Sequence, residues 1–134
     1  MGRNRKPRTW VKIDCAGLLH GSINWQLSLD EQAVWVKLIA LSEVSGGPAG
    51  VICDNDLRPL PREFIAHECH CTTDLLDSCL SKCATEGRIT ENGNGIKITN
   101  FDAYQFTEYD RQKPYRDKNK YEGSGGSYQS KVTR

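Results

Sequence analysis

Basic side chains and aromatic rings alternate near the end of this sequence. The cations are Arg111, Lys113, Arg116, Lys118 and Lys120, and the rings between and beside them are Tyr109, Tyr115 and Tyr121. Lysine and arginine neutralise phosphates and aromatic rings stack on bases, so the mixture is typical of a segment that binds nucleic acid. A charged tail that only keeps a protein in solution has a similar composition, and the sequence leaves both interpretations open.

A second basic segment opens the chain. Residues 1–12 contain Arg3, Arg5, Lys6, Arg8 and Lys12 and no acidic residue. We expect residues 1–8 to form a flexible arm. Such an arm could lie in the minor groove of DNA, as the arms of homeodomains do.

The net charge of +1, from 18 Lys and Arg against 17 Asp and Glu, conceals a segregation of charge. Five bases and no acid fall in residues 1–12, and seven bases against three acids in residues 110–134. Residues 13–109 therefore keep six bases against fourteen acids. An acidic body with two basic ends indicates an anionic partner that binds at the ends.

The cysteines and histidines suggest a different chemistry. The six cysteines are Cys15, Cys53, Cys69, Cys71, Cys79 and Cys83, and two histidines, His67 and His70, lie among them. No hydrophobic export signal follows the basic N-terminus and no apolar run reaches the ~20 residues of a membrane helix, so we expect a cytoplasmic protein with reduced thiols or a metal site. Four soft ligands could surround zinc. However, Cys-x-Cys is tighter than the spacing of familiar zinc sites, and we expect no metal or cofactor.

Catalytic motifs are missing from the sequence. It contains no Gly-rich phosphate loop, Gly-x-Ser-x-Gly elbow or His-Glu-x-x-His motif. Asp54 and Asp56 lie in a polar segment where turn chemistry explains them. We therefore expect a protein that is not an enzyme.

A long helix is predicted after Ser28. Ser28 and Glu31 form a capping box, and apolar residues recur at helical spacing from Ala33 up to Gly46-Gly47-Pro48. Because this helix is apolar around most of its circumference, it is either central in the fold or has one face that binds a partner chain.

A second and a third helix follow a short strand at residues 50–53. Pro59 and Pro61 open the second helix, residues 62–68, with Phe64 and Ile65 predicted to point inward. Thr72 or Thr73 caps the third helix, which Gly87 ends. Its predicted buried stripe is Leu75, Leu76, Cys79, Leu80 and Cys83.

The strongest local pattern is a hairpin. Residues 88–91 and 96–99 alternate in polarity around Asn92-Gly-Asn-Gly95, and the repeated Asn-Gly is expected to supply the positive φ angles of a tight turn. Asn100 is expected to cap a last helix that reaches Phe106. This order of elements is that of a winged helix, in which the third helix can enter the major groove and the hairpin contacts the flanking backbone.

Several segments resemble the N-terminal domain of phage replisome organisers, relatives of the DnaD-like bacterial primosome proteins. They are residues 10–13, 21–25, 29–41, 82–89, 96–101 and 109–116, the last reading Tyr-Asp-Arg-Gln-Lys-Pro-Tyr-Arg. The resemblance implies a winged-helix module of phage or prophage origin that starts replication by binding origin DNA or by assembling with helicase-loading partners. Full-length members of this family usually have a second, C-terminal domain, and we expect that half to be absent from this sequence, which stops shortly after the Gly- and Ser-containing residues 123–127.

Candidate DNA contacts in the body lie on the third helix and the hairpin. The outward positions of the third helix include Thr73, Ser78 and Lys82, but also three carboxylates, which phosphates would repel. The third helix is therefore a weaker candidate for reading the major groove than its place in the motif suggests. The hairpin, or wing, offers Arg88, Asn92, Asn94 and Lys97.

The sequence thus predicts a mostly α protein with a small β-hairpin, an α+β winged helix-turn-helix domain over residues 9–109, with a basic arm (1–8) and a basic tail or linker (110–134). The expected function is non-catalytic DNA binding in replication initiation, with single- and double-stranded DNA both open. The alternative is an assembly module, in which the long helix and Trp10, Trp25 or Trp35 form a homo-oligomer or a primosome and helicase-loader interface.

Overall fold

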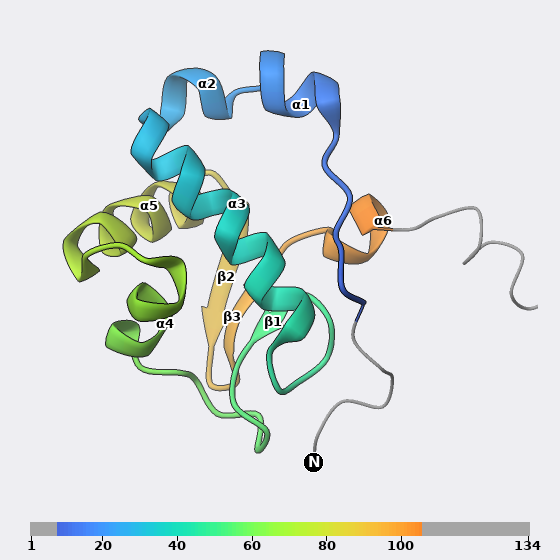
Figure 1. Cartoon of the computed structure of the whole chain (residues 1–134), viewed down its shortest axis with the longest axis vertical. Helices are drawn as coiled ribbons and strands as arrows, with labels where there is room; N and C mark the ends of the chain where they lie inside the picture. The colour runs from blue at the N-terminus through green and yellow to red at the C-terminus, as the bar shows by residue number, and fades with distance from the viewer. Residues whose placement is uncertain (1–7, 106–134) are drawn as a thin grey trace, which may run out of the picture. The chain divides into compact units, whose positions relative to one another are not determined.

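The computed structural model describes residues 8–105, in which helices precede and flank a small sheet (Figure 1). The elements are α1 (Cys15–His20), α2 (Ile23–Gln26), α3 (Leu29–Val44), β1 (Val51–Ile52), α4 (Arg62–Cys69), α5 (Thr73–Thr85), β2 (Ile89–Asn92), β3 (Gly95–Ile98) and α6 (Phe101–Gln105). The strands form one antiparallel sheet in the order β1-β3-β2. The expected α+β class is confirmed. No helix in this described range is long and apolar enough to cross a membrane.

Helix α3 begins where the capping box predicts. The Ser28 hydroxyl accepts a hydrogen bond from the backbone N–H of Glu31 at 3.2 Å, and the Glu31 carboxylate accepts one from the N–H of Ser28 at 2.8 Å. These bonds satisfy two of the backbone donors that a helix start leaves unpaired. The helix runs for 16 residues and ends at Val44, before the predicted Gly46-Gly47 break.

Helices α4 and α5 follow the sequence prediction closely. His70, at a left-handed φ of 58°, ends α4, and the Thr72 hydroxyl caps α5 by accepting from the N–H of Leu75 at 3.1 Å. The prediction for Phe64 is wrong: its side chain is 46% exposed, because the buried face of α4 carries Ile65, Ala66 and Cys69 instead. Leu75 is only half-buried.

The hairpin has the predicted register, with Ile89 opposite Ile98 and Asn92 opposite Gly95. The turn differs from the expectation, because Gly95 is its one residue with a positive φ, 131°. A Cβ atom on Gly95 would lie 2.3 Å from the Ile52 carbonyl oxygen, so the neighbouring strand β1 requires a glycine here.

The sequence did not predict the two short helices α1 and α2. Helix α1 has no buried residue and α2 buries only Ile23, so neither carries a periodic apolar stripe. Residues 10–13 form no helix or strand. Helix α6 begins at Phe101 as predicted, but Asn100 has a left-handed φ of 62° rather than the extended backbone of a typical cap, and Phe106 lies outside the described residues.

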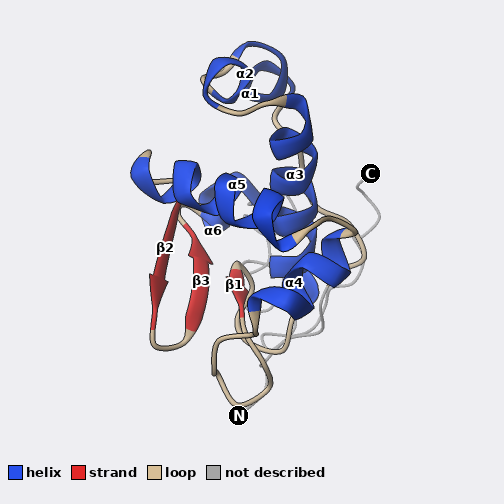
Figure 2. Cartoon of the chain, turned by 90° about the vertical axis from the view of Figure 1, so that its left-hand side faces the viewer, coloured by secondary structure: helices blue, strands red, loops and turns tan. Residues whose placement is uncertain are grey.

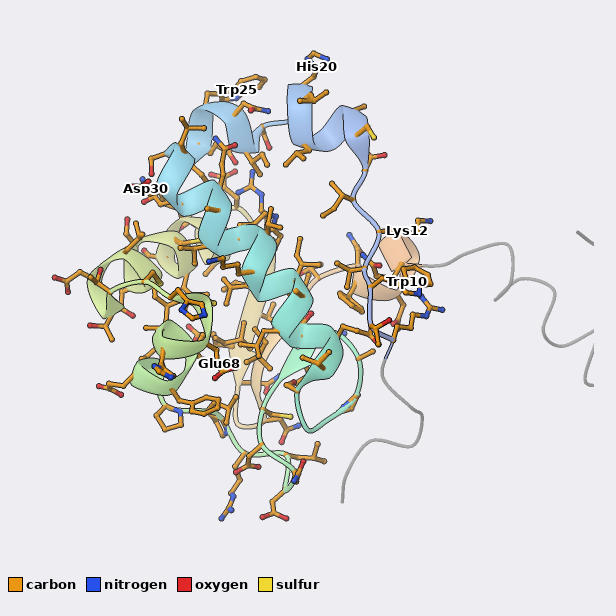
Figure 3. The ribbon with its side chains drawn as sticks, in the orientation of Figure 1. Trp10, Lys12, His20, Trp25, Asp30 and Glu68 are labelled. Atoms are coloured by element: carbon orange, nitrogen blue, oxygen red, sulfur yellow. The ribbon has the colours of Figure 1, made fainter. Side chains whose placement is uncertain are left out.

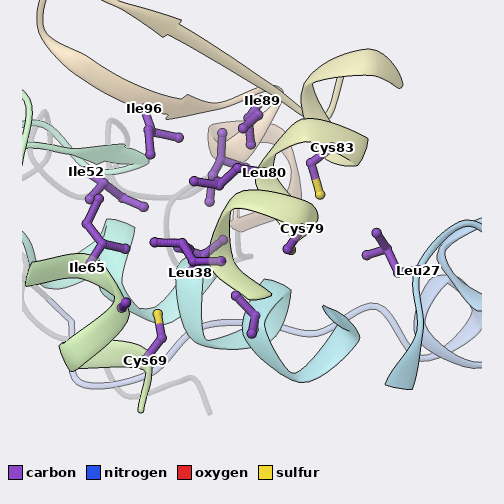
Figure 4. Packing of buried hydrophobic residues seen from close by; sticks show 14 of the residues in the cluster. Leu27, Leu38, Ile52, Ile65, Cys69, Cys79, Leu80, Cys83, Ile89 and Ile96 are labelled. Carbon is purple, nitrogen blue, oxygen red and sulfur yellow. The ribbon is translucent and has the colours of Figure 1, made fainter. Parts of the chain in front are cut away.

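The core forms where α3, α4 and α5 pack with the sheet. Figure 4 shows Leu38 of α3, Ile65 of α4 and Leu80 of α5 directed toward Ile52 and Ile96 of the sheet. All five side chains are at most 4% exposed. Figure 2 shows the β2–β3 hairpin extending from the end of α5, so the core fixes the base of the predicted wing.

Candidate nucleic-acid interface

Two of the predicted DNA contacts on α5 are bound to α3. The Ser78 hydroxyl donates to Oε2 of Glu31 at 2.5 Å, and the Lys82 ammonium donates to Oε1 of the same carboxylate at 2.8 Å. Glu31 is 3% exposed. Ser78 and Lys82 therefore join the predicted recognition helix to the helix that packs against it.

The Glu31 carboxylate is held in its ionised form. Burial by itself raises its pKa, but hydrogen bonds from Lys82, Ser78 and the Ser28 N–H stabilise the anion and bring the pKa down to about 2. The capping box is visible in the sequence, but this second role of Glu31 is not. Ser78 and Lys82 follow Glu31 by 47 and 51 residues, and nothing local in the sequence marks the contact.

The remaining outward face of α5 is acidic. Asp74 and Asp77 are exposed and Thr73 is half-buried. Asp77 lies 3.7 Å from the Arg62 guanidinium, whose Nη2 also donates to both carboxylate oxygens of Glu91 at 3.0 and 2.8 Å. Arg62 is thus already shared between two carboxylates, and the acidic side chains of this face would repel a phosphate backbone. The local sequence does not predict these contacts of Arg62, because Asp77 and Glu91 lie 15 and 29 residues further along the chain.

Arg88, predicted as a wing contact, holds the base of the wing to α2. Its guanidinium donates to the Ser22 hydroxyl at 2.8 Å and to the side-chain oxygen of Gln26. Its side chain is half-buried, and its Nη1 is buried with no hydrogen-bond partner. The Arg88 guanidinium is therefore largely occupied by contacts within the fold, and few of its N–H groups remain for a phosphate.

The other wing candidates remain at the surface. Asn92 and Asn94 are exposed at the tip, where the Asn92 side chain accepts from the N–H of Asn94 at 2.8 Å and shapes the turn. Lys97 is exposed in the middle of β3, between the buried Ile96 and Ile98. Within residues 8–105 its side-chain ammonium makes no hydrogen bond or ion pair, so it is the wing cation open to an anion.

The other body cations have partners. The Lys37 ammonium donates to the Cys69 carbonyl at 3.3 Å, and the Arg58 guanidinium forms ion pairs with Asp54 and Asp56. The Arg8 guanidinium lies 4.9 Å over the Trp10 ring, and Lys12 also interacts with another group. The described range holds eight basic residues against thirteen acidic ones. The body as a whole is therefore poorly suited to neutralise phosphates by itself.

The prediction for the Asp54 segment is confirmed as turn chemistry. The Asp54 carboxylate accepts from the N–H groups of Asp56 and Arg58 at 2.8 and 2.9 Å. The bond from the Arg58 backbone is the main cause that lowers the pKa of Asp54. A carboxylate that accepts these hydrogen bonds stabilises the loop.

The Cys/His cluster is divided between core and surface. Cys69, Cys79 and Cys83 are buried, whereas His67 and His70 are exposed with ring centroids 6.5 Å apart. Burial raises the pKa of Cys69 to about 11, and a hydrogen bond with Cys83 raises that of Cys79. Across residues 8–105 no group of three or more His, Cys, Asp and Glu side chains could hold a metal ion.

The basic extensions lie largely outside the described residues. The predicted contacts Arg3, Arg5, Lys6, Arg111, Lys113, Tyr115, Arg116, Lys118 and Lys120 all fall there. Those segments, 1–7 and 106–134, hold ten basic residues against four acidic ones. The excess positive charge of the protein is therefore in the extensions.

The tryptophans of the assembly alternative differ in exposure. Trp25 is 74% exposed, Trp10 is 50% exposed, and Trp35 is half-buried against the core. Figure 3 places Trp25 beside the start of α3, and Trp10 and Lys12 on the N-terminal segment at the other side of the molecule. Leu19 and Leu29, near Trp25 in sequence, are 65% and 81% exposed. Helices α1, α2 and the start of α3 therefore each expose one large apolar side chain to solvent.

Comparisons of the chain with known protein families, with curated proteins and with solved structures found no significant match.

Proposed function

We propose that this protein is a non-catalytic DNA-binding module that acts in the initiation of DNA replication, and that it binds phosphates through its basic extensions and Lys97. The observation that carries the proposal is the distribution of cations. Seven of the eight in the body have partners or other interactions, whereas the extensions hold ten bases against four acids. Lys97 is the body cation that adds to the extensions.

A winged-helix body is part of the proposal. The order α3-β1-α4-α5-β2-β3 and the sheet order β1-β3-β2 are those of a winged helix, and they support this interpretation. Replication initiation comes from the resemblance to phage replisome organisers. In this protein, we propose, α5 uses Ser78 and Lys82 to hold Glu31 and does not read the major groove.

A salt titration of DNA binding tests the proposal on the full chain. The first variant changes Arg111, Lys113, Arg116, Lys118 and Lys120 to alanine, and the second changes Arg3, Arg5 and Lys6. Each phosphate contact that is lost should lower the slope of log K against log salt by about 0.9 for a duplex and about 0.7 for a single strand. Fluorescence anisotropy with a labelled duplex and the matching single strand gives both slopes.

Matched controls separate the extensions from the body. Lys97→Ala should lower the slope by about one contact, whereas Arg58→Ala, which removes a cation already paired with Asp54 and Asp56, should leave it unchanged. Unchanged slopes in both extension variants would rule out the proposal, as would a larger loss from Arg58→Ala than from Lys97→Ala.

A second candidate function is assembly with another protein chain. The exposed Leu19, Trp25 and Leu29, one in each of the consecutive helices α1, α2 and α3, favour it, because a patch of exposed large apolar side chains would mark an interaction site. DNA binding by the extensions and assembly through the helices use different residues, and each can hold without the other.

A further inference from the structure

The sheet has an inner face, which packs against the helices, and an outer face on the opposite side. Ile96 and Ile98 of β3 are buried, and Figure 4 shows Ile96 directed toward core residues of α3, α4 and α5. Because side chains alternate along a strand, the exposed Lys97 between them lies on the outer face. The register places Val51 of β1 and Thr90 of β2 directly opposite Lys97. These three side chains therefore form one row across the outer face, the outer row.

The strands contribute no carboxylate to this outer face. Glu91 is the one acidic residue in the three strands, and by the same alternation it belongs to the inner face. Its carboxylate is bound there to the Arg62 guanidinium of α4. Asp54 and Asp56, in the turn that follows β1, share the Arg58 guanidinium. The outer row therefore offers an ammonium and a hydroxyl with no competing strand carboxylate.

The N-terminal arm is attached beside this face. The backbone N–H of Arg8, the first described residue, donates to the buried Glu43 carboxylate at 2.7 Å. The neighbouring Ser42 carbonyl accepts from the N–H of Gly50 at 3.0 Å, and Gly50 directly precedes β1. With standard backbone dimensions, these bonds keep the Arg8 nitrogen within about 25 Å of the Lys97 Cα atom. The arm therefore starts less than one ~34 Å turn of DNA from the outer row.

The C-terminal extension follows a helix that begins near the same place. Phe101, the first residue of α6, is buried, and a Cβ atom on Gly50 would lie 2.8 Å from the Phe101 Cβ atom. The Gly50 carbonyl also accepts from the N–H of Ile98 at 2.8 Å. One carboxylate, Asp102, lies between the sheet and residue 106, where the undescribed extension starts. Arg8 and Phe101 therefore both join the body around Gly50, next to the outer row.

These attachment points decide which surface of the body DNA would meet first. DNA that is bound by an extension is at a high effective concentration near the point where the extension is attached. The surface next to those points carries Lys97, whereas the outward face of α5 carries Asp74 and Asp77 and would repel phosphates. The outer face of the sheet is therefore the surface that a phosphate backbone can approach at the lower electrostatic cost.

We propose that the phosphate backbone of DNA lies on the outer face of the sheet, where the Lys97 ammonium and the Thr90 hydroxyl contact phosphate oxygens. This inference rests on the proposed DNA-binding function and names the surface of the body that takes part in it. The arrangement differs from that of most winged helices, in which the third helix enters the major groove. Contacts of this kind position the protein on DNA and do not read its sequence.

Charge substitutions on the two faces test this surface. Thr90→Glu should weaken the binding of DNA about tenfold at low salt, because the new carboxylate would lie against a phosphate. Ser81→Glu adds the same charge at an exposed position of α5 and should weaken binding by no more than about twofold. Fluorescence anisotropy of the full chain with a labelled duplex and with the matching single strand measures both variants, and thermal unfolding checks that each is folded.

The opposite substitutions keep the proposal falsifiable if Thr90→Glu fails to fold. Thr90→Lys should strengthen binding and raise the slope of log K against log salt by about 0.9 for a duplex, whereas Ser81→Lys should leave the slope unchanged. Equal effects at positions 90 and 81, for either sign of charge, would overturn the proposal.

Directed cleavage of bound DNA tests the same surface without relying on affinity. The background is Cys15→Ser with Cys71→Ser, which removes the two cysteines that are not buried. Iron–EDTA attached to Thr90→Cys should cleave bound DNA when ascorbate and peroxide are added, and iron–EDTA attached to Ser81→Cys should give background cleavage only. Cleavage from position 81 that equals or exceeds cleavage from position 90 would place the DNA elsewhere.

The outcomes separate this inference from the function on which it rests. If the wild type binds neither the duplex nor the single strand, the DNA-binding function is wrong and the inference fails with it. If the extension variants lower the salt slope but substitutions at positions 90 and 81 act alike, the extensions bind DNA and the outer face of the sheet does not.

Discussion

The two faces of α3 differ in a way that reverses the usual rule for burial. The inner face buries a carboxylate, Glu31, and a hydroxyl, Ser42, whereas the outer face exposes Leu29 and Val44. Glu31 can be buried because three groups donate hydrogen bonds to its carboxylate: the Ser78 hydroxyl and the Lys82 ammonium from α5, and the backbone N–H of Ser28 from the cap. Leu29 stays exposed because no described element lies opposite it.

The comparison teaches that a neighbour's chemistry decides burial as much as a residue's own hydrophobicity. A buried charge is tolerated when hydrogen bonds replace its hydration. An apolar side chain that no other element covers stays in contact with water and does not stabilise the fold by burial. It can then contact another protein chain.

Truncating one leucine on each face should give the largest contrast. Leu38→Ala should lower the free energy of unfolding by about 3 kcal/mol, because it leaves a cavity among Ile65, Leu80 and the sheet. Leu29→Ala should change it by less than about 0.5 kcal/mol. Urea denaturation at concentrations low enough to keep the chain monomeric measures both. Equal losses would mean that the outer face is packed after all.

Removing the buried charge should have the next largest effect. Glu31→Gln keeps the shape of the side chain but loses the charge-assisted bonds to Ser78 and Lys82, and should cost about 2–3 kcal/mol of unfolding free energy. Glu86→Gln, an exposed carboxylate at the end of α5, is the control and should stay within about 0.5 kcal/mol.

Low pH should remove the stabilisation that the ionised Glu31 carboxylate contributes. The folded-state pKa of Glu31 is about 2, below its ordinary value of 4.5, so its stabilisation is complete above pH 4.5 and is lost as the pH falls toward 2. The shift corresponds to about 3 kcal/mol. Urea unfolding from pH 6 to pH 2 should show the wild type approaching Glu31→Gln. A difference between the two that does not vary with pH would contradict the assigned anion.

The smallest effect should come from Lys82. Lys82→Gln should cost about 1 kcal/mol, because the Lys82 side chain is 47% exposed and its ion pair with Glu31 is screened by water. In the Glu31→Gln background the same change should cost almost nothing, which a double-mutant cycle detects. Lys97→Gln, without a partner in the described range, should show no such coupling.

Most of the elements were readable from local patterns. The capping box at Ser28, the threonine cap of α5 and the Asn-Gly turn each act within a few residues, so their chemistry is visible in the sequence. The short helices α1 and α2 lack such a pattern and were missed. Phe64 was placed inside because periodicity identifies an apolar residue but not the side of a two-turn helix that the core occupies.

The candidate site was less predictable than the fold. The sequence located the segregated charge, the basic extensions and the polar turn at Asp54, because composition and local spacing are enough for these. Only the tertiary structure could show that Ser78 and Lys82 bind Glu31, and that Arg88 binds Ser22 and Gln26. The tertiary structure also decides that the Lys97 ammonium is left unpaired within residues 8–105 and which face of α3 is exposed. These outcomes depend on contacts between residues 47 to 66 positions apart. The sequence does not distinguish a carboxylate or guanidinium that is paired from one that is solvated by water, because only folding brings the partner within hydrogen-bonding distance.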